Sequence, residues 1–350
     1  MITGKPLSND FISKVELGMT GANVGIPGGL PRFDNRVYNI QTGKMTSCVG
    51  SSKSGKTAFA IWRYIFIPWV NGKKKNIKWI FYSLEVDVDQ IKARLAAMFA
   101  FHFYKIEIDP NLIYSLGNNL LSFEQYELIK KISDEHLNPL FDRITFIGDA
   151  NDSYPTAIYK YCLNYYRNNG EVIYETYETM GASDEKINKQ RIVGYKSNKE
   201  EEVFLIIDTL GLMKKESRFT KKDNIDKWLE DYAITLRNIF KTTIINLHHL
   251  NRSISNFDRV KHSGEDLQPQ LDDIKDTSGI GECSDLVLCI FNPNVFKEIE
   301  VHQGYNLNDY KGQYRSLHVL ASRYTECPLN VAVTFNFKTG AWAELPSPKI

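Results

Sequence analysis

Residues 50–57, with the sequence Gly-Ser-Ser-Lys-Ser-Gly-Lys-Thr, constrain the fold of this chain more than any other segment. They match the phosphate-binding loop pattern G-x-x-x-x-G-K-[ST] at every fixed position. That loop requires a strand before it and a helix after it. Residues 45–49 form a short β-prone run, and residues 58–62 form an apolar run compatible with a helix. A chance match is the alternative, but the surrounding pattern favours a nucleoside-triphosphate site.

The residue types in this loop suit ATP and Mg²⁺. Glycines allow backbone N–H groups to surround phosphate oxygens, Lys56 can reach the β- and γ-phosphates, and the Thr57 hydroxyl can ligate Mg²⁺. The residues expected to bind the nucleotide are Gly50, Ser54, Gly55, Lys56, Thr57 and Ala58.

Composition limits the class of protein. The chain has 350 residues, of which 43% are hydrophobic and 24% charged, as in a globular protein with one large core or two modest ones. A net charge of +1 excludes a globally basic nucleic-acid coat, so any polyanion site must be local. Five cysteines without a C-x-x-C pair suit a reducing compartment, and we expect them in the core. No membrane span is expected, because the most apolar segment, residues 59–70, is short and interrupted; a cytoplasmic protein is predicted.

From residue 46 onward, short apolar runs alternate with segments of helical periodicity. This alternation predicts an α/β fold with a mostly parallel sheet and helices on both faces. The expected strands after the first are residues 77–82, 143–147, 203–207, 242–247 and 285–290, with 317–320 and 331–337 closing the sheet as antiparallel strands. A helix is expected over residues 225–240, capped by Asp223 or Asn224.

Two segments fall outside this alternation. Residues 1–30 are expected to form an N-terminal arm or linker, with a short helix at residues 11–15. Residues 31–345 are expected to form the ATPase domain, interrupted by an insertion at about residues 170–200. Within the insertion, residues 171–177 and 191–195 flank a polar stretch at residues 181–183, which suggests a protruding β-hairpin.

Two acidic residues follow predicted strands and so complement the loop. Asp208 ends the apolar strand 204–207, where it can support Mg²⁺ together with Thr57, although an aspartate there can also form a turn. Glu85 follows strand 79–82 and would stand beside the γ-phosphate, which makes it the candidate general base. The competing interpretation is that Glu85 only caps the helix it precedes.

Five ordered motifs resemble those of the DnaB-type replicative helicases, which have the RecA fold, over residues 25–337. Residues 25–30 with Phe33 and Asp34 resemble the first family segment. Residues 81–85, F-Y-S-L-E, are similar to the family's F-S-L-E, and residues 206–213, I-I-D-T-L-G-L-M, are similar to its I-D-Y-L-Q-L-M. Residues 247–252, L-H-H-L-N-R, resemble L-S-Q-L-N-R, and residues 273–288 resemble its D-L-R-E-S-G-A-I…A-D-V-V-L segment with one residue of slippage.

The resemblance implies roles for individual residues. Glu85 would polarise the attacking water, Asp208 would support Mg²⁺, and His249 would occupy the position of the γ-phosphate sensor, which is usually Gln in the family. Arg323 aligns with the arginine finger that acts on a neighbouring subunit's nucleotide. Otherwise His249 would be a structural histidine and Arg323 a solvated strand-end residue. The family lysine two residues before that arginine is replaced by Ala321, so trans-activation is expected to be weaker or differently built.

The resemblance also implies single-stranded DNA as a partner, threaded through a hexamer's central channel. Basic residues follow the two strands whose loops grip DNA in the family, although such a run can also be a solvated face. The candidates are Lys214, Lys215, Arg218, Lys221, Lys222, Arg252, Arg259 and Lys261. A separate primase or loader is a further expected partner, and residues 9–18 resemble a shortened linker helix that docks on the adjacent subunit.

The leading hypothesis is therefore an ATP-driven, DnaB-like, 5′-to-3′ DNA helicase motor of a phage or similar replicon, acting in the host cytoplasm. A RecA-like recombinase filament would share the fold, the phosphate loop and the basic loops. A nucleotide-binding loader or assembly module without translocation is the third possibility, motivated by Ala321.

Overall fold

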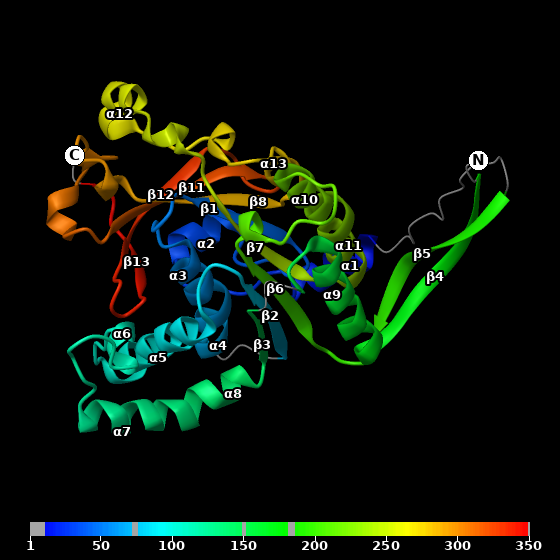
Figure 1. The fold of residues 1–350 in the computed structure, drawn as a ribbon, viewed down its shortest axis with the longest axis horizontal. Coiled ribbons are helices and arrows are strands. Elements are labelled where there is room, and N and C mark those ends of the chain that lie inside the picture. Colours follow the sequence, from blue (N-terminus) through cyan, green and yellow to red (C-terminus); the bar gives the residue numbers. More distant parts are fainter. Residues whose placement is uncertain (1–10, 72–75, 149–151, 181–185, 349–350) are drawn as a thin grey trace.

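A nine-stranded sheet forms the centre of the protein, which is described from a computed structural model over residues 11–71, 76–148, 152–180 and 186–348. The strand order is β13-β12-β11-β8-β1-β7-β6-β2-β3 (Figure 1). The strands are β1 (Met45–Gly50), β2 (Ile77–Ser83), β3 (Ile144–Ile147), β6 (Glu202–Asp208), β7 (Thr243–His249), β8 (Leu286–Phe291), β11 (Tyr314–Ser322), β12 (Leu329–Phe335) and β13 (Trp342–Glu344).

The six strands from β8 to β3 are parallel, and β1 lies between β7 and β8. β11, β12 and β13 extend the β8 edge as antiparallel strands. The predicted mostly parallel sheet with antiparallel closing strands is therefore confirmed. Because parallel strands all end at the same edge, β1, β2, β6 and β7 bring the residues that follow them together.

Helices cover both faces of this sheet (Figure 1). They are α1 (Phe11–Met19), α2 (Pro31–Val37), α3 (Lys56–Ile61), α4 (Ile67–Val70), α5 (Val88–Tyr104), α6 (Pro110–Ile113), α7 (Phe123–Ile132), α8 (Asn138–Phe141), α9 (Pro155–Asn169), α10 (Lys221–Lys227), α11 (Ile234–Phe240), α12 (Phe257–Ser263) and α13 (Gly279–Cys283). Neighbouring strand residues point to opposite faces: Cys48 packs in the cluster with α3 and α5, and Val49 in the cluster with α9 and α11. In the described ranges, no helix is long and apolar enough to cross a membrane.

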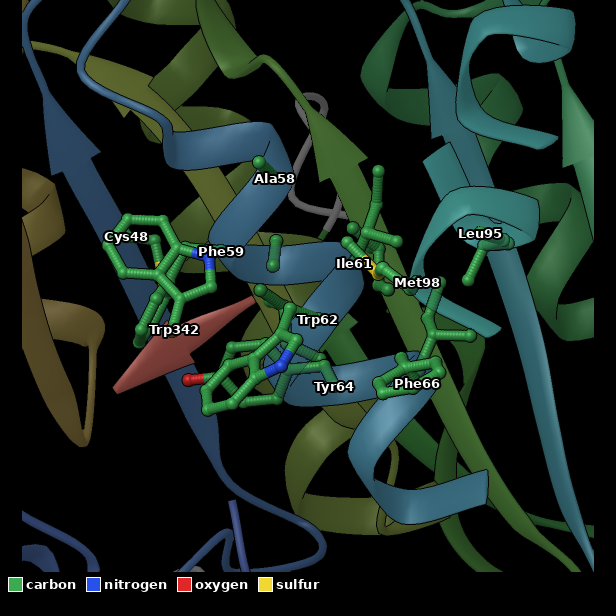
Figure 2. Packing of buried hydrophobic residues seen from close by; sticks show 14 of the residues in the cluster. Cys48, Ala58, Phe59, Ile61, Trp62, Tyr64, Phe66, Leu95, Met98 and Trp342 are labelled. Carbon is green, nitrogen blue, oxygen red and sulfur yellow. The ribbon is translucent and has the colours of Figure 1, made fainter. Parts of the chain in front are cut away.

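The helix after the phosphate-binding loop is anchored in the first of these clusters. α3 continues through a π-helical turn, Trp62–Phe66, into α4. Figure 2 shows Trp342 of β13 beside Phe59, and their rings meet edge to face at 5.1 Å between centroids. On the α5 side, Phe66 meets Phe99 in the same way at 5.1 Å. This packing fixes the start of α3, and with it the loop.

Two details of the sequence interpretation are corrected. The helix expected from residue 225 begins at Lys221 and is capped by Thr220, not by Asp223 or Asn224. Asp223 instead completes a capping box, because its side chain accepts a hydrogen bond from the Thr220 backbone while Thr220 accepts one from Asp223 N–H. Of the five cysteines, Cys327 is exposed, because it lies in the turn between β11 and β12 and not within a strand.

The two segments outside the alternating pattern have contrasting structures. α1 leaves large apolar side chains exposed, including Phe11 and Met19. β4 (Gly170–Met180) and β5 (Lys186–Ser197) form an antiparallel hairpin that projects from the body (Figure 1). The polar stretch at residues 181–183 lies outside the described residues, as do residues 1–10 of the expected arm.

A buried ion pair holds the chain's first packed segment to the helix after the loop. Arg63 Nη1 lies 2.6 Å from Asp34 Oδ1, and both side chains are almost fully buried. The other carboxylate oxygen accepts hydrogen bonds from Gly28 N–H at 2.8 Å and Leu30 N–H at 3.1 Å. A Cβ at Gly28 would lie 2.0 Å from Arg63 Nη1, so only glycine fits this approach.

We expect Asp34→Ala to lower the free energy of unfolding by about 3–5 kcal/mol, because it leaves the Arg63 guanidinium buried without a counter-charge. Urea denaturation measures this loss. The double variant Asp34→Ala with Arg63→Met should regain part of the stability, since it removes the orphaned charge. A loss below about 1 kcal/mol for Asp34→Ala would mean that the pair is solvated.

Candidate nucleotide site

The phosphate-binding loop lies where the predicted strand–loop–helix context places it, between β1 and α3. Lys56 Nζ donates hydrogen bonds to the carbonyl oxygens of Gly50 at 3.0 Å and Ser51 at 2.9 Å. The Thr57 hydroxyl donates to Asp208 Oδ2 at 2.7 Å. The structure therefore brings together the loop and the acid at the end of β6, as the sequence predicted.

The loop geometry fits a triphosphate with Mg²⁺. A Cβ at Gly50 would lie 2.6 Å from both the Ile290 carbonyl and Ser54 Oγ, and Gly55 has φ +103°, a conformation that favours glycine. Among the described residues, Ser54 Oγ and Asp208 Oδ1 are buried side-chain atoms without a hydrogen-bond partner. A phosphate oxygen suits the first, and a hard cation shared with Thr57 suits the second.

His249, at the end of β7, joins the lysine of the loop to the candidate base. Its Nδ1 lies 3.3 Å from Lys56 Nζ, and its Nε2 lies 3.2 Å from Glu85 Oε2. Since an ammonium group only donates, Nδ1 accepts from Lys56, and the neutral ring then carries its proton on Nε2 and donates to Glu85. One imidazole thus contacts both groups that would meet the γ-phosphate.

The backbone places Glu85, and it is not the cap of α5. Asp87 caps that helix by accepting a hydrogen bond from Asp89 N–H. The Glu85 N–H instead donates to the Asp208 carbonyl at 3.0 Å, which continues the β2–β6 pairing past the strand end. The structure therefore argues against the capping interpretation of Glu85.

The charges around the site tune its carboxyl groups. The hydrogen bond from His249 lowers the pKa of Glu85, helped by the nearby charges of His249 and Lys56 and opposed by burial. Burial raises the pKa of Asp208 to about 6, against the hydrogen bond from Thr57. Burial lowers the pKa of Lys56, while the charges of Glu85 and Asp208 act in the opposite direction. At neutral pH Glu85 is thus ionised and able to accept a proton.

Arg323 does not join this group within one chain. β11 is antiparallel to β8, and Ser322 pairs with Leu286, the first residue of β8. Arg323 therefore lies at the edge where the parallel strands begin, whereas the loop lies where they end. The six residues of β1 alone span about 20 Å. The Arg323 guanidinium donates to the Glu282 carbonyl at 2.9 Å and lies 3.9 Å from Asp285, with about half of its side chain (52%) exposed.

Comparison with known proteins identifies relatives of this chain. The replicative DNA helicases DnaB of Rickettsia felis and Rickettsia typhi are each 25% identical to this chain over 284 residues, which is 78% of this chain and 46% of theirs. The chain is homologous to the DnaB replicative helicases. It spans less than half the length of these relatives. No protein-family model matches the chain.

Two solved structures have the same fold. A helicase ATPase domain superposes with a TM-score of 0.69 at 15% identity, covering 98% of this chain and all of that domain. A DnaB-like replicative helicase, studied with its interactions with primase, gives the same TM-score and identity and covers 98% of this chain and 69% of that one. The sheet is therefore a RecA-like ATPase fold, as predicted.

The loops that would hold DNA in a DnaB-type motor leave the sheet next to each other, after β6 and β7. Several of the predicted cations in them are exposed: Lys214, Lys215, Arg218, Arg252 and Lys261. Three others make ion pairs within the protein. Lys222 lies 2.6 Å from Asp226, Lys221 lies 3.9 Å from Asp276, and Arg259 Nη2 donates to Asp273 at 2.9 Å and to the Gln268 carbonyl.

Two arginines near the site were missed by sequence reasoning. Arg315 of β11 reaches the loop, where its Nε donates to the Ser54 carbonyl at 3.1 Å, and burial lowers its pKa to about 10. Arg94 of α5 is largely buried near the charge of Asp208, and this burial lowers its pKa. The signal for Arg315 was present, because it is a lone cation at the start of an apolar strand. Arg94 had no such signal, since arginine is common on helices.

Proposed function

We propose that this chain is the ATP-hydrolysing motor of a DnaB-type DNA helicase, which moves along single-stranded DNA during replication. The observation that carries the proposal is the chain of contacts from Lys56 through His249 to Glu85, beside the Thr57–Asp208 hydrogen bond. Homology to DnaB gives this arrangement its context.

The arrangement suits in-line attack of water on the γ-phosphate. Glu85 accepts the proton of the water, Lys56 binds the β- and γ-phosphates, and backbone N–H groups of the loop surround the phosphate oxygens. His249 responds to the γ-phosphate, because its two ring nitrogens contact Lys56 and Glu85. Thr57 and Asp208 would hold Mg²⁺, which neutralises charge on the phosphates when it is bound.

A ring of subunits, with six as the family resemblance implies, would complete the site. Arg323 lies at the opposite edge of the sheet from its own loop, so it can act only on a nucleotide held by another subunit. The exposed apolar residues of α1, Phe11, Ile12, Val15, Leu17 and Met19, fit a helix that docks on a neighbouring copy. Residues 31–345 would form the motor domain, with residues 170–200 as an insertion.

Single-stranded DNA is the proposed track, held by the exposed cations of the two loops after β6 and β7. A separate primase or loader is a candidate partner, since a DnaB-like helicase has been studied with its interactions with primase. The cytoplasm, or the host cytoplasm for a phage protein, is the proposed location.

The test is the ATPase rate with and without single-stranded DNA at two salt concentrations. We expect strong stimulation by DNA that weakens as salt rises, because phosphate contacts release counterions. The double variant Lys215→Ala with Arg218→Ala should weaken DNA binding for all sequences. It should also reduce the slope of log affinity against log salt by about 0.7 for each lost phosphate contact.

Lys160→Ala is the matched control, since it removes an exposed cation from α9, on the helical layer and away from both loops. An ATPase rate that DNA does not change would favour a nucleotide-binding loader. An open filament on DNA in micrographs would favour a recombinase.

A further inference from the structure

A hollow of about 820 Å³ opens beside the end of β11, at the opposite edge of the sheet from the phosphate-binding loop. Two distant segments line it. α2 and the residue after it contribute Arg36 and Tyr38, and the turn after β11 contributes Arg323, Tyr324 and Glu326. The hollow therefore has two guanidinium groups and one carboxylate, a surplus of positive charge suited to a polyanion.

The two arginines differ in how they are engaged. Arg323 is partly committed to its own chain through the Glu282 carbonyl and Asp285. Arg36 is exposed, and across the described ranges it makes no hydrogen bond, ion pair or cation–π contact. β11 itself gives the hollow no second cation, because Arg315 is turned to the Ser54 carbonyl and Ala321 is uncharged.

Arg36 nevertheless stands on a rigid element. Its neighbours Phe33 and Val37 are fully buried, and Asp34 is locked to Arg63 in the buried ion pair. At the C-terminus of α2, Tyr38 adopts a left-handed conformation with φ 57°. Its ring then meets Tyr324 edge to face at 6.2 Å. α2 is thus fixed to both the core and the rim of the hollow, which is what a positioned charge requires.

We propose that Arg36 is a second trans-acting cation, which contacts the triphosphate held by the neighbouring subunit together with Arg323. The proposal rests on the proposed function, since it needs subunits that share a nucleotide site. Arg36 would then be a catalytic residue supplied by α2. Phosphoryl transfer spreads negative charge over the γ-phosphate oxygens, so a second guanidinium group stabilises the transition state more than one partly paired arginine does.

The first experiment measures DNA-stimulated ATP hydrolysis by Arg36→Gln, which removes the charge and keeps a polar side chain. We expect kcat to fall about 10- to 100-fold at saturating DNA, with oligomeric state and unfolding midpoint unchanged. Arg36→Lys should keep most of the rate, and Lys160→Gln, an exposed cation on α9, should match the wild type.

The second experiment tests whether Arg36 acts in trans. Arg36→Gln is mixed with Lys56→Ala, whose subunits cannot hydrolyse their own ATP but keep Arg36. The mixture should be more active than either variant alone, because complete nucleotide sites then face intact Arg36 side chains. No recovery on mixing would place Arg36 in its own chain's site or in the fold, and would overturn the proposal.

Arg323→Ala, assayed in parallel, separates this proposal from the proposed function. If Arg323→Ala loses activity and Arg36→Gln keeps the wild-type rate, Arg36 has no role and the shared site stands. If neither variant loses activity, the shared site itself fails. If Arg36→Gln only raises the DNA concentration needed for half-stimulation, the hollow binds DNA and the proposal is wrong.

Discussion

A Glu85→Gln variant should bind ATP as the wild type does and hydrolyse it about 10²- to 10⁴-fold more slowly, the range that a positioned general base contributes. Glutamine keeps the shape of the side chain and can still pair with His249, but its neutral amide cannot accept the proton of the attacking water. The hydrogen bond from His249 lowers the pKa of Glu85, so the wild-type group is ready as a base at neutral pH.

Single-turnover hydrolysis with saturating ATP, together with equilibrium binding of a fluorescent ATP analogue, separates chemistry from binding. Asp87→Asn is the matched control, because it changes a neighbouring carboxylate that caps α5 and does not touch the site. Lys56→Ala should differ from both variants by losing phosphate binding as well as hydrolysis. Normal turnover by Glu85→Gln would remove Glu85 from the role of base.

The parts of the fold that depend on local pattern could be predicted from the sequence. Each predicted strand of the parallel core is present, because buried parallel strands are continuous apolar runs bounded by turns. Asp208 was found for the same reason, since it directly follows such a run and the parallel topology fixes which edge it reaches. Thr220 was missed as the cap of α10, because a hydroxyl and a carboxylate three residues apart are equally plausible caps until the helix start is known.

The contacts that join distant segments could not be predicted in this way. His249 and Lys56 lie 3.3 Å apart only because β7 pairs with β1, and no local pattern states that pairing. The same holds for Arg315, which reaches the loop from an antiparallel strand. Arg36 and Arg323 meet at one hollow because α2 is held to the core by Arg63, and the sequence shows only two arginines far apart in the chain.

An Arg323→Ala variant should lose about 10³-fold or more of the DNA-stimulated ATPase rate, the loss expected for an arginine that stabilises a phosphoryl-transfer transition state. The position of Arg323 requires that this effect act between subunits. The substitution should leave the fold intact, because Asp285 keeps its hydrogen bond from Met45 N–H at 2.9 Å and its contact with Arg237 Nη1 at 3.3 Å.

Titrating Arg323→Ala into the wild type at constant total protein tests the shared site. If each subunit completes the site of its neighbour and the subunits of a ring act in sequence, one defective subunit stalls the ring, and activity should fall more steeply than the fraction of wild-type protein. A linear decline would mean that subunits work independently. An unchanged rate for pure Arg323→Ala would mean that no subunit depends on this arginine, and the protein would then use its nucleotide without a shared site, as a loader or assembly module would. The titration therefore decides between a motor that works through its neighbours and a protein that only binds its nucleotide.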